Sequence, residues 1–185
     1  NIRKRSANFD VRQHEFREEF RKIGPFMYTC EDPYEQLDVY HERIASMEKE
    51  MATLLDSAGL FEVNVPDFKQ IKQCRKEIIL LKTLWDMVYI VRTSVDDWKT
   101  TPWLAINVEQ MDMDCKKFSK DIRTLDKEMR AWDTYSGVES TVKNMLTSLH
   151  AVAELQNPAI RDRHWHQLMQ ATGVRFSMDE STTLA

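Results

Sequence analysis

The sequence predicts an all-α fold, an elongated stack of long antiparallel helices that together form a helical-bundle rod. Only four glycines and five prolines interrupt its 185 residues, so turns are few and elements are long. Apolar residues recur at alternating steps of three and four, which is the spacing of one helix face. Residues that cap helix N-termini precede several of these apolar stripes. A few helices of about 25–30 residues each form a rod rather than a compact bundle.

The first helix is expected to end at the pair Gly24-Pro25, because glycine and proline both interrupt helices. We expect residues 1–25 to be the end of a longer preceding element. Its apolar face is made by Phe9, Phe16, Phe20 and Ile23.

A second helix is predicted to begin at Pro33 and to end at Gly59. Asp32 is placed to accept a hydrogen bond at the N-cap, proline is favoured at the first helical position, and Glu35 completes a capping box. Its narrow apolar stripe consists of Leu37, Tyr40, Ile44, Met47, Met51, Leu54 and Ala58.

A third helix is predicted from Phe68 to about Asp97, and Asp67 repeats the capping pattern at its start. Apolar residues occur on nearly every side of this helix between Ile78 and Val91, which indicates a central helix packed by several neighbours.

A compact corner is predicted after the third helix. Thr101 precedes Pro102 and is therefore pushed out of the helical region, while the indoles of Trp98 and Trp103 require burial.

Two further helices are predicted to begin at Asn107 and at Ser136, because each of these residues is a favoured N-cap. A sixth is expected to begin at Asn157-Pro158 and to end near Gly173. The stripe of the fourth helix is expected to run through Met111, Cys115, Phe118, Ile122, Leu125, Met129 and Trp132. That of the fifth comprises Val138, Val142, Met145, Leu149 and Val152.

Charge and cysteine content exclude several classes of partner and site. The formal net charge of -4 provides no overall basic field for nucleic acid or an anionic membrane. The stretch from Glu31 to Pro66 carries nine acidic residues against two basic ones, which fits either a basic partner or, as we favour, the solvated face of a charged helix. Three widely spaced cysteines indicate neither a disulfide framework nor a zinc site, and fit a reducing compartment.

No catalytic, cofactor-binding or metal-binding residue is predicted. The four glycines are too far apart for a phosphate-binding loop. His164 and His166 point about 200° apart on a helix, so they cannot share a metal. Asp38 and His41 have carboxylate-x-x-His spacing, but a di-iron bundle needs two such motifs and two further glutamates. The thiols on the apolar stripes, Cys74 and Cys115, are expected to be inert.

The stretch from Asn157 to Trp165, Asn-Pro-Ala-Ile-Arg-Asp-Arg-His-Trp, resembles the signature of the dynein heavy-chain linker. Further pieces occur in the family's order: Gly24-Pro25-Phe26, Leu80 to Trp85, Trp98 with Thr101-Pro102-Trp103, and Trp132. The chain from Val138 to Ala185 is most similar to axonemal heavy chains of the outer-arm beta type. Since the sequence also lacks an initial Met and stops in mid-pattern, we expect a piece of a longer protein.

The resemblance implies that residues 1–185 form the tail-proximal part of a linker that arches over a ring of AAA+ modules and moves with the nucleotide state. Residues 1–25 would then end the preceding tail helix. ATP and magnesium would bind the ring of the parent chain, an ATP-hydrolysing microtubule motor, and not this segment. Expected partners are the chain's own ring and tail, other heavy chains and accessory chains, with microtubules contacted only through the parent chain. The expected location is the cytoplasm, in the axoneme of a cilium or flagellum.

The residues expected to carry this function are structural. We hypothesise that those at the corners stabilise the rod and do not contact nucleotide. The full set is Trp85, Trp98, Pro102, Trp103, Trp132, Asn157, Pro158, Arg161, Arg163, His164 and Trp165.

The main alternative is a spectrin-like passive structural repeat, which would also give long helices and buried tryptophans. It predicts an internal period, and the sequence shows none. A helical enzyme ranks last, because such a site needs convergent polar groups among apolar stripes that contain almost none.

Overall fold

The structure is a computed structural model, and it describes residues 1–156. No strand occurs in that part, which confirms the all-α class; the elongated rod stays a prediction. None of the helices within residues 1–156 is both long enough and apolar enough to span a bilayer.

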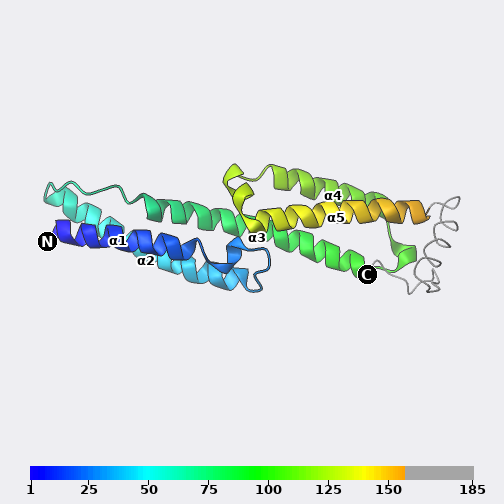
Figure 1. Ribbon diagram of the computed structural model, residues 1–185, viewed down its shortest axis with the longest axis horizontal. Helices are drawn as coiled ribbons and strands as arrows, with labels where there is room; N and C mark the ends of the chain where they lie inside the picture. Colours follow the sequence, from blue (N-terminus) through cyan, green and yellow to red (C-terminus); the bar gives the residue numbers. More distant parts are fainter. Residues whose placement is uncertain (157–185) are drawn as a thin grey trace. The chain divides into compact units, whose positions relative to one another are not determined.

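Along the chain (Figure 1), the elements are α1 (Ile2–Phe20), η1 (Gly24–Phe26), α2 (Pro33–Leu60), α3 (Lys69–Thr100), η2 (Trp103–Ala105), α4 (Val108–Arg123), η3 (Lys127–Ala131) and α5 (Asp133–Gln156), where η denotes a 3₁₀ helix.

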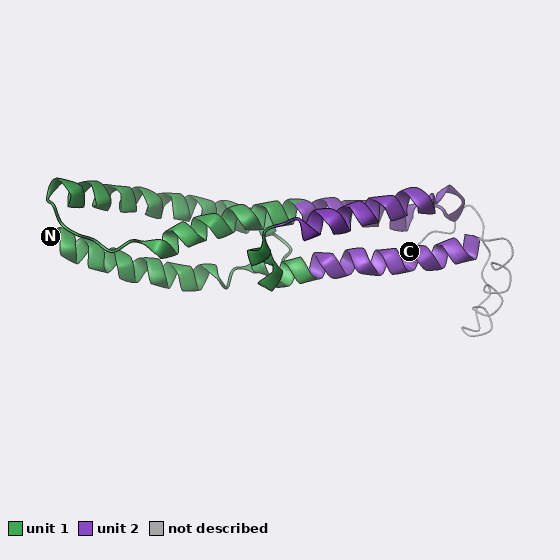
Figure 2. Ribbon diagram, turned by 90° about the horizontal axis from the view of Figure 1, so that it is seen from above, with its two compact units in different colours: residues 1–86, 126–136 green, residues 87–125, 137–185 purple. Residues whose placement is uncertain are grey.

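The chain folds into two compact units, which Figure 2 distinguishes by colour. Unit 1 combines Asn1–Asp86 with the later segment Asp126–Ser136. Unit 2 combines Met87–Leu125 with the chain from Gly137 onward. Helices α3 and α5 therefore contribute residues to both units. That residues 1–185 act as one continuous segment stays a prediction.

Unit 1 is built on three helices that pack on one another. Ion pairs join α1 to α2 (Arg12 to Glu50) and α2 to α3 (Arg75 to Glu48), and both pairs of helices run antiparallel. The ring of Phe9 in α1 meets that of Phe68, just before α3, edge to face at 4.8 Å. The apolar residues buried among the three helices are Phe9, Phe16, Phe20, Leu37, Ile44, Leu54, Ala58, Phe68, Ile71, Cys74, Ile78, Leu81, Leu84 and Trp85.

Unit 2 is built from the second part of α3, the helix α4 and most of α5. Trp98 of α3 and Phe118 of α4 stack with ring centroids 6.5 Å apart. The predicted stripe of α5 faces inward, since Val138, Val142, Met145, Leu149 and Val152 are all buried. Burial of these stripes supplies the main stabilisation of the unit.

Two predicted helix starts have different outcomes. The cap at Asn107 is confirmed, because its Oδ1 atom accepts a hydrogen bond from the backbone N–H of Gln110 at 3.1 Å. Asp32 is the N-cap residue of α2, which begins at Pro33 as predicted, but its side chain does not make the expected capping hydrogen bond. The Asp32 carboxylate instead accepts a hydrogen bond from the side-chain amide of Gln36 at 2.8 Å, so it is turned away from the backbone N–H groups.

The prediction that the fourth helix continues to Trp132 is also wrong, because α4 ends at Arg123. The hydroxyl of Thr124 donates to the carbonyl of Asp121 at 2.7 Å, and the Asp126 carboxylate then accepts from the backbone N–H of Glu128 to start η3. Met129 remains buried after this break, so the apolar spacing continues although the α-helix does not.

The predicted cap at Ser136 is wrong as well. Helix α5 begins three residues earlier, at Asp133, and the backbone N–H of Ser136 already bonds to the carbonyl of Trp132. The sixth helix, predicted from Asn157 to Gly173, lies outside the described residues.

Candidate functional site

A buried junction in unit 1, centred on the backbone carbonyl of Pro25, is the candidate functional site. We call it the Pro25 junction and define it by Pro25, Phe26, Trp85, Trp132 and Thr134. The Pro25 oxygen accepts hydrogen bonds from Trp85 Nε1 at 2.8 Å and from Thr134 Oγ1 at 2.7 Å. A carbonyl oxygen has two lone pairs, so its accepting capacity is filled. Three segments far apart in sequence therefore converge on one buried atom.

Aromatic rings extend the Pro25 junction. Phe26 packs edge to face on Trp132, with centroids 5.0 Å apart, and on Phe20 at 5.5 Å. The backbone N–H of Tyr28 donates to the Asp133 carboxylate at 2.9 Å, which fixes the start of α5 beside η1. Such aromatic pairs contribute about 0.5–1.5 kcal/mol beyond their buried area.

Gly24, next to the junction, is closely approached by two side chains. A Cβ atom on Gly24 would lie 2.9 Å from both Cys30 Sγ and Gln36 Nε2. The backbone N–H of Gly24 also donates to Gln36 Oε1 at 3.0 Å, which holds η1 against α2. A larger residue would have to displace the Cys30 and Gln36 side chains and so disturb this contact between η1 and α2.

Two of the residues singled out from the sequence thus meet at the same place. Trp85 is 2% exposed and supplies a hydrogen bond, whereas Trp132 is half-buried and supplies a ring contact. The roles of Pro25 and Thr134 were not predicted. A backbone acceptor has no side-chain signature, and Thr134 lies 109 positions from Pro25.

The predicted corner after the third helix lies in unit 2. The indoles of Trp98 and Trp103 are both buried, as predicted. The hydroxyls of Thr100 and Thr101 each donate to the carbonyl of Asp97 at 2.9 Å and so occupy an acceptor at the end of α3. Pro102 is exposed and stands at the N-cap of η2, so its contribution is to the backbone direction and not to the core.

The remaining six residues of the predicted set lie outside the described part of the chain. They are Asn157, Pro158, Arg161, Arg163, His164 and Trp165.

A buried ion pair between α1 and α3 is a second feature that the sequence analysis did not find. Arg17 donates to both carboxylate oxygens of Glu77, and the two side chains are only 14% and 10% exposed. Burial alone would lower the pKa of Arg17, but the hydrogen bonds to Glu77 and Cys74 outweigh burial and raise it. The paired hydrogen bonds fix the register of α1 on α3.

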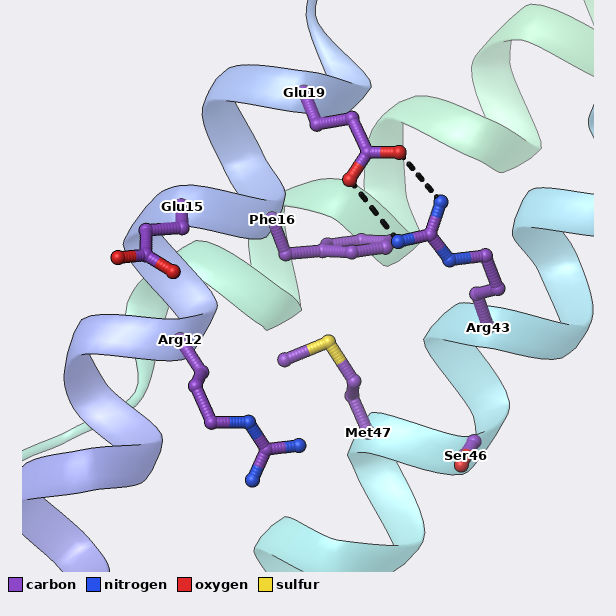
Figure 3. Close-up of a pocket in the computed structure, with 7 residues that line it drawn as sticks. All are labelled: Arg12, Glu15, Phe16, Glu19, Arg43, Ser46 and Met47. Atoms are coloured by element: carbon purple, nitrogen blue, oxygen red, sulfur yellow. Dashed lines mark hydrogen bonds and ion pairs between the residues drawn. The ribbon is translucent and has the colours of Figure 1, made fainter.

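A pocket of about 380 Å³ lies between α1 and α2 (Figure 3). Two of its charged lining residues, Glu19 and Arg43, pair with each other, and Arg12 pairs with Glu50 outside the lining. Glu19 accepts two hydrogen bonds from Arg43 and one from Tyr40, which together lower the pKa of Glu19. The guanidinium of Arg43 also lies over the ring of Phe16 at 5.0 Å. These contacts join the two helices, and an anionic ligand would have to displace Glu19 to reach Arg43.

Comparison with known proteins assigns the family. Residues 71–185 match the family model described as "Dynein heavy chain, N-terminal region 2". The chain belongs to the dynein heavy chain family.

Individual dynein relatives align along the entire segment. It is 68% identical over 184 residues to "Dynein beta chain, ciliary" of Tripneustes gratilla, and 59% identical to "Dynein axonemal heavy chain 17" of Homo sapiens. It is 35% identical over 198 residues to "Dynein beta chain, flagellar outer arm" of Chlamydomonas reinhardtii. These alignments cover 99–100% of the dynein segment but 4% of each relative, so the segment spans only a small part of their length.

The cysteines of this dynein segment differ in their environment. Burial, and to a smaller extent Asp112 and Asp114, raises the pKa of Cys115 to about 11. Burial also raises the pKa of Cys74, against the opposing effect of Arg17. Cys30 is only partly buried. Within residues 1–156, no three His, Cys, Asp or Glu side chains are grouped so that they could hold a metal ion.

We therefore expect alkylation of the native heavy chain with iodoacetamide at pH 8 to modify Cys30 at least about tenfold faster than Cys115, because the thiolate is the reactive form. Peptide-resolved mass spectrometry over a time course measures both rates. Urea-unfolded heavy chain is the control, in which the two rates should become similar. Equal rates in the native protein would contradict the assigned environments.

Proposed function

We propose that this segment is the tail-proximal part of the linker of an axonemal dynein heavy chain. In this role it couples ATP-driven changes of the AAA+ ring to movement of the tail in ciliary or flagellar beating. The observation that carries the proposal is the alignment of the whole segment with ciliary, axonemal and flagellar heavy chains, together with the family match over residues 71–185.

The packing of the segment supports a mechanical role. Each bend of a helix in unit 1 would have to separate apolar stripes whose buried Leu, Ile or Phe side chains each contribute about 1.5–3 kcal/mol. The Pro25 junction also ties η1, α3 and the start of α5 to one carbonyl. A segment with these ties resists deformation under load, as a coupling element requires.

The partners and location follow from the same proposal. The segment would act together with its own AAA+ ring and tail, with other heavy chains and accessory chains, and with microtubules only through the parent chain. ATP and magnesium would bind the ring, and the assembly would lie in the axoneme of a cilium or flagellum. The segment itself would perform no catalysis.

An insertion that makes α3 compliant tests the coupling in the full heavy chain. Six Gly/Ser residues placed after Thr83 interrupt α3 in the middle of its packed stripe. We expect the variant to retain ATP turnover by the ring and to lose most of its microtubule gliding velocity. Steady-state ATP turnover and gliding assays measure the two quantities.

The matched control carries the same insertion after Asn64, in the connection between α2 and α3, where no helix is interrupted. This variant should keep both its ATP turnover and its velocity. A passive structural repeat predicts that neither insertion changes the ratio of velocity to ATP turnover. An unchanged ratio in the α3 variant would therefore contradict the proposal.

A further inference from the structure

A second pocket of unit 1, also of about 380 Å³, lies in the groove between α2 and α3. Leu37 and Ile78 are buried beneath it, while Ile79 is 58% exposed at its edge. Ile79 therefore presents an exposed apolar side chain at the edge of a groove whose floor is formed by Leu37 and Ile78. We call this feature the α2/α3 groove.

One side of the α2/α3 groove is acidic. Four exposed carboxylates follow one another at steps of four, three and four. Glu35, Asp38 and Glu42 share one face of α2, about 10 Å long, and Glu31 lies two residues before the helix. Asp38 belongs to this row and also lines the groove, which places the row along the groove's edge. We call the row the acidic stripe; it consists of Glu31, Glu35, Asp38 and Glu42.

The acidic stripe differs from Glu48 and Glu50, two carboxylates further along α2, because these two have ion-pair partners among the described residues. Glu48 pairs with Arg75 and Glu50 pairs with Arg12. Within residues 1–156, no side chain forms a hydrogen bond or ion pair with a carboxylate of the stripe. On the opposite side of the groove, Lys82 is paired with Asp86, which also accepts a hydrogen bond from Tyr34. The unbalanced charge of the groove is therefore negative and confined to one edge.

We propose that the α2/α3 groove binds a basic amphipathic helix of a partner protein. A helix lying in the groove would place an apolar row, spaced at three and four residues, against Ile79 and over the floor formed by Leu37 and Ile78. Lysines or arginines one turn apart on its flank would then lie opposite the acidic stripe. Nucleic acid and anionic lipid are repelled by the same charges.

A synthetic helix provides the probe for the full heavy chain. The peptide carries leucines at i, i+3, i+4 and i+7 and lysines along one flank, and a second peptide has glutamates in place of the lysines. Fluorescence anisotropy should show binding of the lysine peptide and much weaker binding of the glutamate peptide. The triple variant E35Q/D38N/E42Q should weaken lysine-peptide binding about tenfold, and Ile79→Asp should weaken it as well.

The matched control, E15Q/E18Q/E109Q, removes the same number of exposed carboxylates elsewhere and should leave the affinity unchanged. A benzophenone on the apolar row of the peptide should cross-link to residues of α2 and α3 that line the groove. Equal affinity for the two peptides, equal losses in the two triple variants, or cross-links elsewhere would overturn the proposal. A further outcome would also overturn it: the heavy chain does not bind the peptide, and Ile79→Asp reduces self-association of the heavy chain. In that case a second copy of the heavy chain, and not a partner helix, would occupy the groove.

Discussion

Replacing Trp85 with alanine is expected to lower the free energy of unfolding by about 3–5 kcal/mol, the usual cost of removing a large buried aromatic side chain. The indole is 2% exposed, so its loss leaves a cavity. It also removes one of the two donors to the Pro25 carbonyl. Urea unfolding followed by circular dichroism measures the change.

Two variants separate the cavity from the hydrogen bond at the Pro25 junction. Trp85→Phe retains most of the ring but loses the N–H donor, and should cost about 1–2 kcal/mol. Thr134→Val keeps the shape of the side chain but loses the hydroxyl that donates to Pro25, and should lower the free energy of unfolding by about 1 kcal/mol. Tyr89→Ala, at a tyrosine that is 64% exposed, is the control and should change stability by less than about 0.5 kcal/mol. If Trp85→Ala and Tyr89→Ala unfold at the same urea concentration, the junction has no structural importance.

Removing one partner of the buried ion pair, by Arg17→Met or Glu77→Leu, is expected to destabilise the chain by about 3–5 kcal/mol. Either change leaves a buried charge without its counter-charge, because both side chains are almost completely covered. Cys74 and Gln73 contact the pair but neither is a charged partner. Urea unfolding of each single variant measures the loss.

The double variant R17M/E77L decides what the ion pair contributes. Because it removes both charges together, its free energy of unfolding should return to about that of the original chain or rise above it. The matched control is the exposed pair formed by Arg43 and Glu19, where Arg43→Met should cost about 1 kcal/mol or less. Additive losses in the double variant R17M/E77L would show that the two side chains act independently, contrary to the geometry.

The fold could be predicted from the sequence because each helix carries its own local signals. The apolar stripe of α2 and the cap at Asn107 both depend on residues within a few positions of one another. The end of α4 could not be predicted in this way. Met129 keeps its place in the three-and-four pattern and remains buried, so the pattern is the same for a continued α-helix and for a break followed by a 3₁₀ turn.

The candidate site was predicted only in part, for a different physical reason. A tryptophan needs burial wherever it lies, so Trp85 could be identified as structural from its type and position. Its hydrogen bond to Pro25 spans 60 positions, and the pairing of Arg17 with Glu77 also spans 60. A single sequence carries no signal for contacts at that separation. The acidic stretch from Glu31 to Pro66 is evident from composition, but the position of the acidic stripe beside the α2/α3 groove depends on α3.

The division of unit 1 between two stretches of the chain has a consequence for the nascent polypeptide. A ribosome that has just produced Asp86 has not yet made Trp132 or Thr134, and it must first translate Met87–Leu125. During that interval Phe26 lacks its ring contact with Trp132, and the Pro25 oxygen can accept a hydrogen bond from Trp85 but not yet from Thr134. The N-terminal helices therefore cannot complete the packing of unit 1 until Asp126–Ser136 has been synthesised, 39 residues later.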